Sequence, residues 1–394
     1  MPTHRRWADL QAGLVSHIAG RCTLQDYASC CAVCGAWRAA LPPLTSWPLA
    51  PVLVPADGTA SHEPLSLGVC SLHAQRWSPL LGLRQPSGLA NPTDCRCVGA
   101  RDGWVVLAAA GDASAKAGAS ILLFNPLTGP AKSSKVVFSP YPTARDFAAV
   151  SICPPNSLAV QRTTDGCSST FVLDTGALMD GAVLADVAFG DDGKVVYWLT
   201  RHGAVHVLRL NRRRHRGRMR PVEIEPLVTG TDVVFPTPYD TIAQFTDAKN
   251  LVLCDGVQYQ VWRRPNGAGS VQAPAGIYDQ RLLRISESAV FVLMYDPRRR
   301  PCWSESKDLG GHAVFLGTND AGAVCGDGAA VLMNGNCLYY WSSRPEGDYE
   351  AFVYNMATGM STRLPPATGG VSSPLWYFLP AVEAASEEVN CYCL

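Results

Sequence analysis

The sequence lacks several features that mark broad classes of protein. It has no excess of charge, because 33 Lys and Arg balance 33 Asp and Glu among 394 residues, so no overall field draws it to nucleic acid or acidic membranes. It has no apolar run close to the roughly 18 residues that span a bilayer. It also has no Asn-x-Ser/Thr acceptor free of proline. These absences disfavour nucleic-acid-binding, membrane-spanning and secreted proteins.

The N-terminus and the cysteines favour an intracellular protein. Met1–Leu10 (MPTHRRWADL) has no apolar core of a secretory signal. The 15 cysteines are odd in number and scattered, whereas an extracellular disulfide framework prefers an even, regular set in a small domain. We expect reduced, mostly buried thiols, in the nucleus and/or the cytoplasm.

The composition is that of a folded chain, with 47% hydrophobic and 17% charged residues. Its length allows one large domain and a small module. Residue composition and spacing divide the chain into four parts: a helical stretch at 1–45, a Pro/Ser/Gly-rich connection with the first strands at 46–100, a β-rich domain at 101–382 and a flexible tail at 383–394.

The β pattern is the strongest structural signal. Lys194–Thr200 (KVVYWLT) and Ala204–Leu210 (AVHVLRL) are β-branched and aromatic runs joined by Arg201-His202-Gly203, which predicts a hairpin. Asp255-Gly256 precedes a similar run, Val257–Trp262, and Asp-Gly tolerates the positive φ of tight hairpin turns.

A second pattern recurs, in which an apolar run meets Asn or Asp, then Thr-Gly, then a further short strand. It occurs at Leu122–Gly129, Phe171–Gly176 and Ala351–Gly359, with Lys135–Phe138 and Ser361–Leu364 as following strands. Asn125 and Asp174 are 49 residues apart, close to the period of propeller blades. We therefore predict a β-propeller, with an irregular all-β domain as the alternative.

The first 45 residues carry helical spacing. The apolar positions of three short helices are Leu10, Leu14 and Ile18, then Leu24, Tyr27, Ala28 and Cys31 after a Thr23–Asp26 capping pattern, then Val33, Trp37 and Leu41. Pro42-Pro43 ends the last. So small a unit should bury its apolar stripes against a partner or the rest of the chain.

Two resemblances follow. Trp7-Ala8-Asp9-Leu10, Leu14, Ile18, Asp26 and Val33-Cys34-Gly35-Ala36-Trp37-Arg38 resemble the F-box. The remainder resembles the plant F-box family with a KIB-type β-propeller, on Asp308–Gly317 (DLGGHAVFLG), Asn336–Tyr340 (NCLYY) and Trp376–Pro380 (WYFLP). The fold implied is a small all-α F-box of three helices followed by a large all-β propeller domain.

The resemblance implies a non-catalytic substrate receptor of a ubiquitin ligase. The F-box would dock on a Skp-type adaptor, and through it on a cullin and a RING protein, while the β domain holds a protein target. The implied adaptor-binding residues are Leu10, Gln11, Leu14, Ile18, Val33 and Trp37. Trp37 is the expected anchor; the alternative is that these residues form the module's own core.

The sequence departs from the F-box pattern at Gln11, where the family has proline, and at Cys31 and Gly35, where basic residues are common. Gln11 keeps open an alternative role as a propeller scaffold without productive ligase assembly. For enzymes, Gly190–Lys194 lacks the spacing of a phosphate-binding loop. We therefore expect no catalytic residue and no cofactor.

Three remaining motifs are weak. Cys31-x-x-Cys34 has no second pair at zinc-finger spacing, so we expect no metal site. The basic run Arg212, Arg213, Arg214, Arg216, Arg218 and Arg220 is interpreted as a solvated hairpin tip, with nuclear import as the alternative. Cys391–Leu394 matches a prenylation signal formally, but a frayed tail is the preferred interpretation.

Overall fold

The structure is a computed structural model whose described part consists mainly of β-strands. The described residues are 10–19, 22, 26, 30–31, 33–41, 49–54, 66–71, 77–79, 95–101, 104–109, 121–125, 129–131, 137–140, 147–153, 157–164, 167–175, 183–210, 214–215, 218–219, 223–228, 234–264, 269–276, 279–317, 321–325, 334–343, 349–365, 375–376 and 378. The described helices are α1 (Ala12–Ala19), α3 (Gly35–Ala40) and the single-turn α5 (Tyr239–Ile242).

The strands of the N-terminal half form three antiparallel sheets in chain order. The first has β1 (Leu49–Val54), β2 (Ser66–Ser71) and β3 (Trp77–Pro79); the second has β4 (Cys95–Arg101), β5 (Trp104–Ala109), β6 (Ile121–Asn125) and β7 (Gly129–Ala131); the third has β8 (Val137–Phe138), β9 (Phe147–Cys153), β10 (Ser157–Thr164) and β11 (Cys167–Asp174). Each strand pairs with its neighbour in the sequence.

Three further sheets follow. The fourth has β12 (Leu184–Phe189), β13 (Val195–Thr200), β14 (Val205–Arg209) and β17 (Glu223–Pro226); the fifth has β18 (Ala248–Cys254), β19 (Val257–Arg263), β22 (Val290–Tyr295) and β23 (Trp303–Glu305); the sixth orders β25 (Gly322–Cys325), β24 (His312–Leu316), β26 (Cys337–Ser343), β27 (Tyr349–Asn355) and β28 (Met360–Arg363). Two-stranded hairpins project from the fourth and fifth: β15 (Arg214–His215) with β16 (Arg218–Met219), and β20 (Val271–Gly276) with β21 (Asp279–Ile285).

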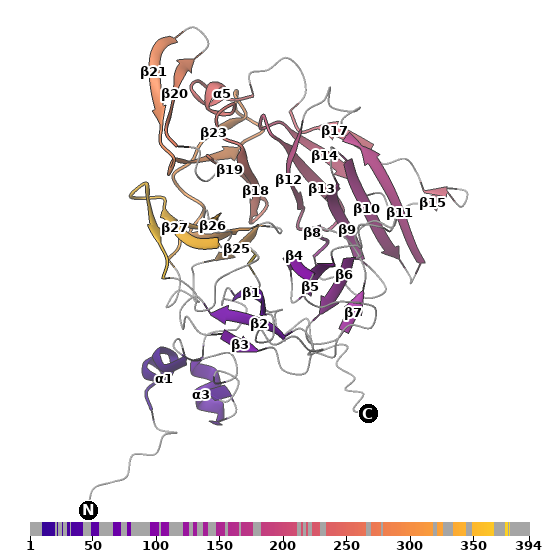
Figure 1. The fold of residues 1–394 in the computed structure, drawn as a ribbon, viewed down its shortest axis with the longest axis vertical. Helices are drawn as coiled ribbons and strands as arrows, with labels where there is room; N and C mark the ends of the chain where they lie inside the picture. The colour runs from indigo at the N-terminus through magenta and orange to yellow at the C-terminus, as the bar shows by residue number, and fades with distance from the viewer. Residues whose placement is uncertain are drawn as a thin grey trace, which may run out of the picture.

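The six sheets follow one another around a common centre (Figure 1). Early strands of successive sheets touch, in the order β1 to β4, β4 to β8, β9 to β12, β12 to β18 and β18 to β24. This radial repetition is the β-propeller that the sequence predicts, and it buries each sheet between neighbours. The alternative of an irregular all-β domain is wrong for the described residues.

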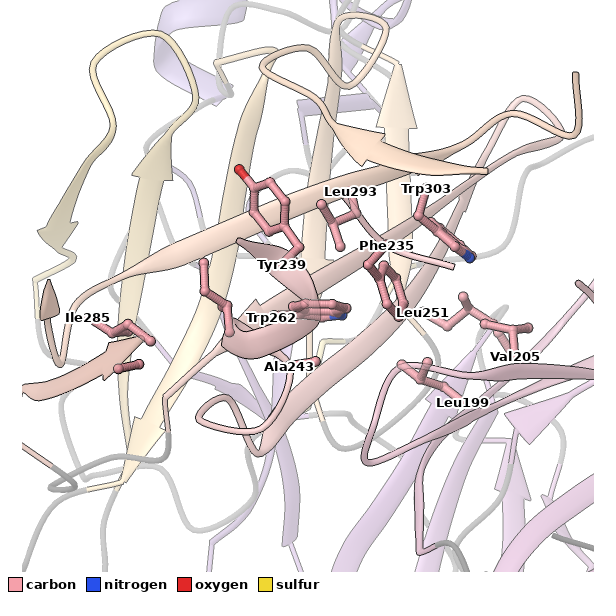
Figure 2. Close-up of a cluster of buried hydrophobic side chains, with 13 residues drawn as sticks. Leu199, Val205, Phe235, Tyr239, Ala243, Leu251, Trp262, Ile285, Leu293 and Trp303 are labelled. Atoms are coloured by element: carbon pink, nitrogen blue, oxygen red, sulfur yellow. The ribbon is translucent and has the colours of Figure 1, made fainter. Parts of the chain in front are cut away.

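The hydrophobic cores lie between adjacent sheets. Val150 and Trp198 belong to the core between the third and fourth sheets, and Val252 and Val314 to the core between the fifth and sixth. The largest cluster joins the fourth and fifth sheets through α5 and is centred on Trp262, which is fully buried (Figure 2). Side chains that alternate along each strand supply both faces of a blade.

The predicted hairpins are present. Lys194–Thr200 and Ala204–Leu210 contain β13 and β14, which pair antiparallel from Leu199 and Val205 outward. Asp255 and Gly256 connect β18 to β19 with φ of 48° and 76°, the left-handed conformation that two-residue hairpins require.

The repeated Asn/Asp–Thr–Gly pattern marks the outer edge of three sheets. At Ala351–Gly359, Asn355 Oδ1 accepts from the backbone N–H of Ala357 and Thr358 at 2.9 and 3.1 Å, and Gly359 has a φ of 66° before β28 begins. One predicted partner strand is wrong: Val137–Phe138 pairs with β9 of the next sheet, and β7 completes the hairpin after Asn125.

The three C-terminal segments that carry the propeller resemblance come together at the sixth sheet. Asn336 Oδ1 accepts from the backbone N–H groups of Leu309 and Gly311 at 2.9 and 3.0 Å, and this fixes the turn before β24. Trp376 donates from Nε1 to the carbonyl of Leu316 at 2.9 Å. The described residues thus show why these separated segments form one motif.

Among the residues that the structure describes, none of the helices has the length and apolar character needed to cross a membrane.

Candidate functional site

Within the described residues, two parts are candidates for binding a partner, and the first is the N-terminal helical module. Its core is Val15 and Ala19 of α1 packed against Trp37 of α3 and Leu41. The carbonyl of Gln11 accepts from the N–H groups of Leu14 and Val15 at 2.9 and 3.1 Å, which begins α1. α1 and α3 lie side by side, outside the ring of sheets (Figure 1).

The module leaves three large apolar side chains exposed to solvent. Leu14 is 51% exposed, Ile18 37% and Val33 51%. Leu14 and Ile18 are four residues apart and share one face of α1, while Val15 and Ala19 form its buried face. The sequence predicts the exposed stripe of Leu14 and Ile18 but does not single out the inner pair, although Val15 and Ala19 carry the same four-residue spacing.

The other predicted adaptor-binding residues have different environments. Leu10 is half-buried against the module core, and the side chain of Gln11 is exposed. Trp37 is only 7% exposed and lies inside the module. Its backbone N–H donates to Cys34 Sγ at 3.5 Å, which caps the start of α3. The structure therefore places Trp37 in the core of the module, with Val15, Ala19 and Leu41. Of the predicted second helix, Asp26, Cys30 and Cys31 are described and are helical.

The cysteines of the module are free thiols. Cys22 donates to the carbonyl of Ile18 at 3.3 Å, and burial, followed by the neighbouring Cys30, raises the pKa of its thiol to about 11. In the described part of the chain, no group of three or more His, Cys, Asp or Glu is arranged to hold a metal ion.

The basic run lies between β14 and β17, which pair antiparallel. Arg214 and Arg218 belong to the small β15–β16 hairpin. The other predicted import residues, Arg212, Arg213, Arg216 and Arg220, lie outside the described residues.

The second candidate is a cavity of about 280 Å³ beside α5, which the sequence analysis did not identify. It is lined by His202 and Ala204 of the β13–β14 turn and by Val234, Phe235, Asp240 and Ala243 of the segment around α5. Phe235 and Ala243 are buried, whereas His202 and Ala204 are exposed. The cavity therefore has an apolar floor and a polar rim.

A chain of buried hydrogen bonds holds the floor of the cavity. Trp262 Nε1 donates to Gln260 Oε1 at 2.8 Å, and Gln260 Nε2 donates to the carbonyl of Gly203 at 2.9 Å. Phe235 packs edge-on against Trp262, with ring centroids 4.9 Å apart. The turn, the strand β19 and the aromatic floor are thereby fixed to one another.

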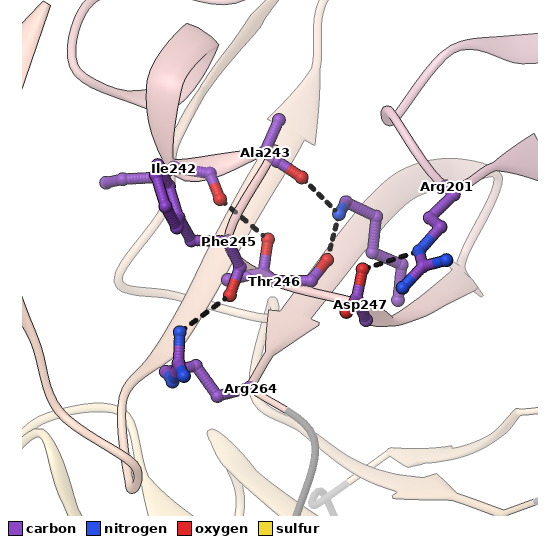
Figure 3. Close-up of polar contacts among 8 residues, drawn as sticks. Arg201, Ile242, Ala243, Phe245, Thr246, Asp247 and Arg264 are labelled. Carbon is purple, nitrogen blue, oxygen red and sulfur yellow. Dashed lines mark hydrogen bonds and ion pairs between the residues drawn. The ribbon is translucent and has the colours of Figure 1, made fainter. Parts of the chain in front are cut away.

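Cations secure the segment that follows α5 (Figure 3). Buried Lys249 donates from Nζ to the carbonyls of Ala243, at 2.7 Å, and Thr246, and lies 5.1 Å from the centroid of the Trp262 ring. Arg264 donates to the carbonyl of Phe245 at 3.2 Å. Carbonyls left over at the end of a helix need such donors.

The charged groups beside this segment are the buried Lys249 and the exposed Arg201–Asp247 ion pair. Burial lowers the pKa of Lys249 from 10.5 to about 8, and the charge of Asp247 opposes that shift. Arg201 pairs with Asp247 at 2.5 Å, and this hydrogen bond lowers the pKa of the Asp247 carboxyl. The ion pair bridges the β13–β14 turn to the residue that precedes β18.

Comparison with known proteins agrees with the fold. Residues 74–355, more than two thirds of the chain, match the family model described as the KIB1-4 β-propeller. No curated protein matches at the level that would mark a relative. A β-propeller domain supports a role in protein interaction.

The chain is also similar to solved structures at low identity. A protein assigned as a 6-phosphogluconolactonase from Bacteroides uniformis has 10% identity and a TM-score of 0.37, with 84% of this chain and 99% of that chain covered. The β-propeller domain of Cps50 (Swd1) from Myceliophteria thermophila has 11% identity and a TM-score of 0.37, with 83% and 90% covered.

Proposed function

Because the chain belongs to the KIB1-4 β-propeller family, we propose that it is the substrate-receptor subunit of an SCF-type (Skp–cullin–F-box) ubiquitin ligase. The observation that carries the proposal is the exposure of three apolar side chains of the N-terminal helical module, Leu14, Ile18 and Val33, which we call the exposed row. The resemblance of this module to the F-box supplies the identity of the partner, a Skp-type adaptor.

Covering the exposed row with a partner would be favourable, because it removes apolar surface from water. Leu14 and Val33 each leave half of their surface in water, so covering either one contributes about 1–1.5 kcal/mol. The buried Val15 and Trp37 keep the helices together beneath the row, so that little conformational entropy is lost when a partner covers it.

The proposed mechanism is tethering, and the chain would contribute no catalytic group. The helical module would hold the adaptor, and through it the cullin, the RING protein and the ubiquitin-loaded conjugating enzyme. The propeller would hold a protein target. Bringing a target lysine close to the thioester raises its effective concentration to the millimolar range or beyond.

Affinity purification of the full chain from cells, followed by mass spectrometry for adaptor and cullin, tests this proposal. We expect both subunits with the wild type and neither with the double variant Leu14→Asp plus Val33→Asp. Leu282→Asp is the matched control, since Leu282 is a 64% exposed leucine on β21, and it should retain both subunits. Recovery of adaptor and cullin with the double variant would refute the proposed docking surface.

A second candidate function is an interaction scaffold without productive ligase assembly. The exposed Gln11 favours it, because proline at the start of a helix would preorganise the chain and Gln11 does not. Under this alternative the purified chain would bring down a propeller partner but no cullin. Replacing Gln11 with Pro should then strengthen adaptor recovery.

A further inference from the structure

We propose that the cavity beside α5 binds an arginine side chain presented by a protein partner. Under the proposed function this partner would be the ligase target, and only that identification of the partner rests on the proposed function. The chemistry of the cavity is independent of the adaptor and can be tested without it.

The size of the cavity selects a side chain. At about 280 Å³ it lies just below the range of roughly 300–1,000 Å³ that encloses cofactors and drug-sized ligands. It opens between the β13–β14 turn and α5, where His202 and Ala204 are exposed. A segment lying across this rim could insert one long side chain.

The charge of the lining selects a cation. Asp240 is the one carboxylate among the described lining residues, and none of them is Lys or Arg. Asp240 Oδ1 accepts from the backbone N–H of Thr241 at 2.8 Å and from its hydroxyl at 3.4 Å, and neither bond uses Oδ2. Arg201 does not neutralise Asp240, because it pairs with Asp247.

The aromatic floor favours arginine over lysine. Phe235 lines the cavity, and a planar guanidinium can contact an aromatic ring while its fork of donors reaches a carboxylate. An ammonium group offers no such planar fit and is more strongly hydrated. The combination of Phe235 and Asp240 therefore matches a guanidinium at the end of an apolar stem.

The cavity is already formed in the free chain. Phe235 is held edge-on by Trp262, and Ala243 is held through its carbonyl by Lys249. Little ordering is needed on binding, so even a single inserted side chain should give measurable affinity.

The test is a ligand-observed NMR titration of the full chain with three acetylated, amidated tripeptides, Ala-Arg-Ala, Ala-Lys-Ala and Ala-citrulline-Ala. Citrulline keeps the shape of arginine without its charge. We expect a Kd of about 1 mM for the arginine peptide, weaker binding of the lysine peptide, and binding of the citrulline peptide weaker than that of the arginine peptide by about tenfold or more.

Two variants locate the binding. Asn at position 240 can still accept from the N–H of Thr241 but carries no charge. Asp240→Asn should therefore weaken binding of the arginine peptide by about tenfold or more. Ala204→Trp fills the cavity from its exposed rim and should abolish binding, which decides the matter if Asp240→Asn fails to fold. Glu287→Gln is the control, because Glu287 is an exposed acid outside the cavity.

Equal binding of the arginine and citrulline peptides would overturn the proposal. So would wild-type affinity in folded Asp240→Asn or Ala204→Trp, or no binding of the arginine peptide at concentrations up to about 10 mM. Because the purified chain is used alone, none of these results depends on adaptor docking. Loss of adaptor binding would equally leave the peptide result intact.

Discussion

A β-carbon on Gly203 would lie 2.8 Å from Cζ of Phe235, closer than real β-carbons approach another atom. The same carbon would lie 2.9 Å from Cζ2 of Trp262. The β13–β14 turn can therefore rest on the aromatic floor of the cavity only because residue 203 has no side chain. The backbone φ of 89° at this position also favours glycine.

Gly203→Ala should destabilise the protein by about 2–4 kcal/mol, because a steric clash adds to the cost of a positive φ. Gly256→Ala is the matched control: its φ is 76°, but an added β-carbon would meet nothing within 4 Å. It should cost only about 1–2 kcal/mol. Equilibrium urea unfolding of the full chain measures both, and equal losses would show that the close approach to Phe235 is not tight.

Gln260→Leu should cost about 2–5 kcal/mol. The side chain is fully buried, and its loss leaves both the carbonyl of Gly203 and Nε1 of Trp262 without their partner, at about 1–3 kcal/mol for each unsatisfied group. Gln272→Leu is the control. Gln272 on β20 is exposed, so its replacement should change stability by less than about 0.5 kcal/mol. A neutral effect of Gln260→Leu in urea unfolding would contradict the bridging role of Gln260.

Lys249 should make stability rise with pH in the alkaline range. Its pKa is about 8 in the folded protein against an ordinary 10.5, so between these values the unfolded chain binds one more proton than the native chain. The free energy of unfolding then increases with pH across this window, by up to about 3 kcal/mol. Below pH 8 both states are protonated and the contribution is constant.

Urea unfolding of wild type and Lys249→Met at pH 7.5, 8.5 and 9.5 isolates this contribution. The wild type should gain stability relative to the variant as the pH rises. Lys307→Met is the control, since Lys307 is exposed, and it should run parallel to the wild type. Parallel curves for Lys249→Met would mean that Lys249 does not titrate in this window.

Much of the propeller could be predicted from local chemistry. Asp255-Gly256 forms its turn through its own backbone conformation, and Asn355 forms one through side-chain bonds to the next residues. Strands such as β13 carry a run of β-branched and aromatic residues. The turn after Thr200 was predicted correctly for the same reason. These features depend on neighbours in the sequence, which a sequence displays directly.

The rest depends on contacts between distant residues. Val137–Phe138 joins the next sheet because β9 offers it a partner, and β24 pairs parallel to β26, which no turn signal specifies. The cavity escaped prediction because Pro236 and Pro238 make its segment look like a plain loop. Lys249 of β18 and Arg264, which follows β19, help to hold the carbonyls that follow α5, and such contacts cannot be seen in the sequence.

The proposed adaptor-binding residues were predictable only in part. Periodicity placed Leu14 and Ile18 on one stripe, but it could not decide which apolar face of α1 points inward. That choice depends on where α3 packs, and Trp37 packs against Val15.

The most direct test of the central claim is isothermal titration of a purified Skp-type adaptor into the purified full chain. The account predicts a Kd of about 1 μM or tighter for the wild type, and binding at least about tenfold weaker for Leu14→Asp plus Val33→Asp at an unchanged unfolding midpoint. A folded wild-type chain that shows no heat of binding and no complex at about 100 μM adaptor would contradict the account.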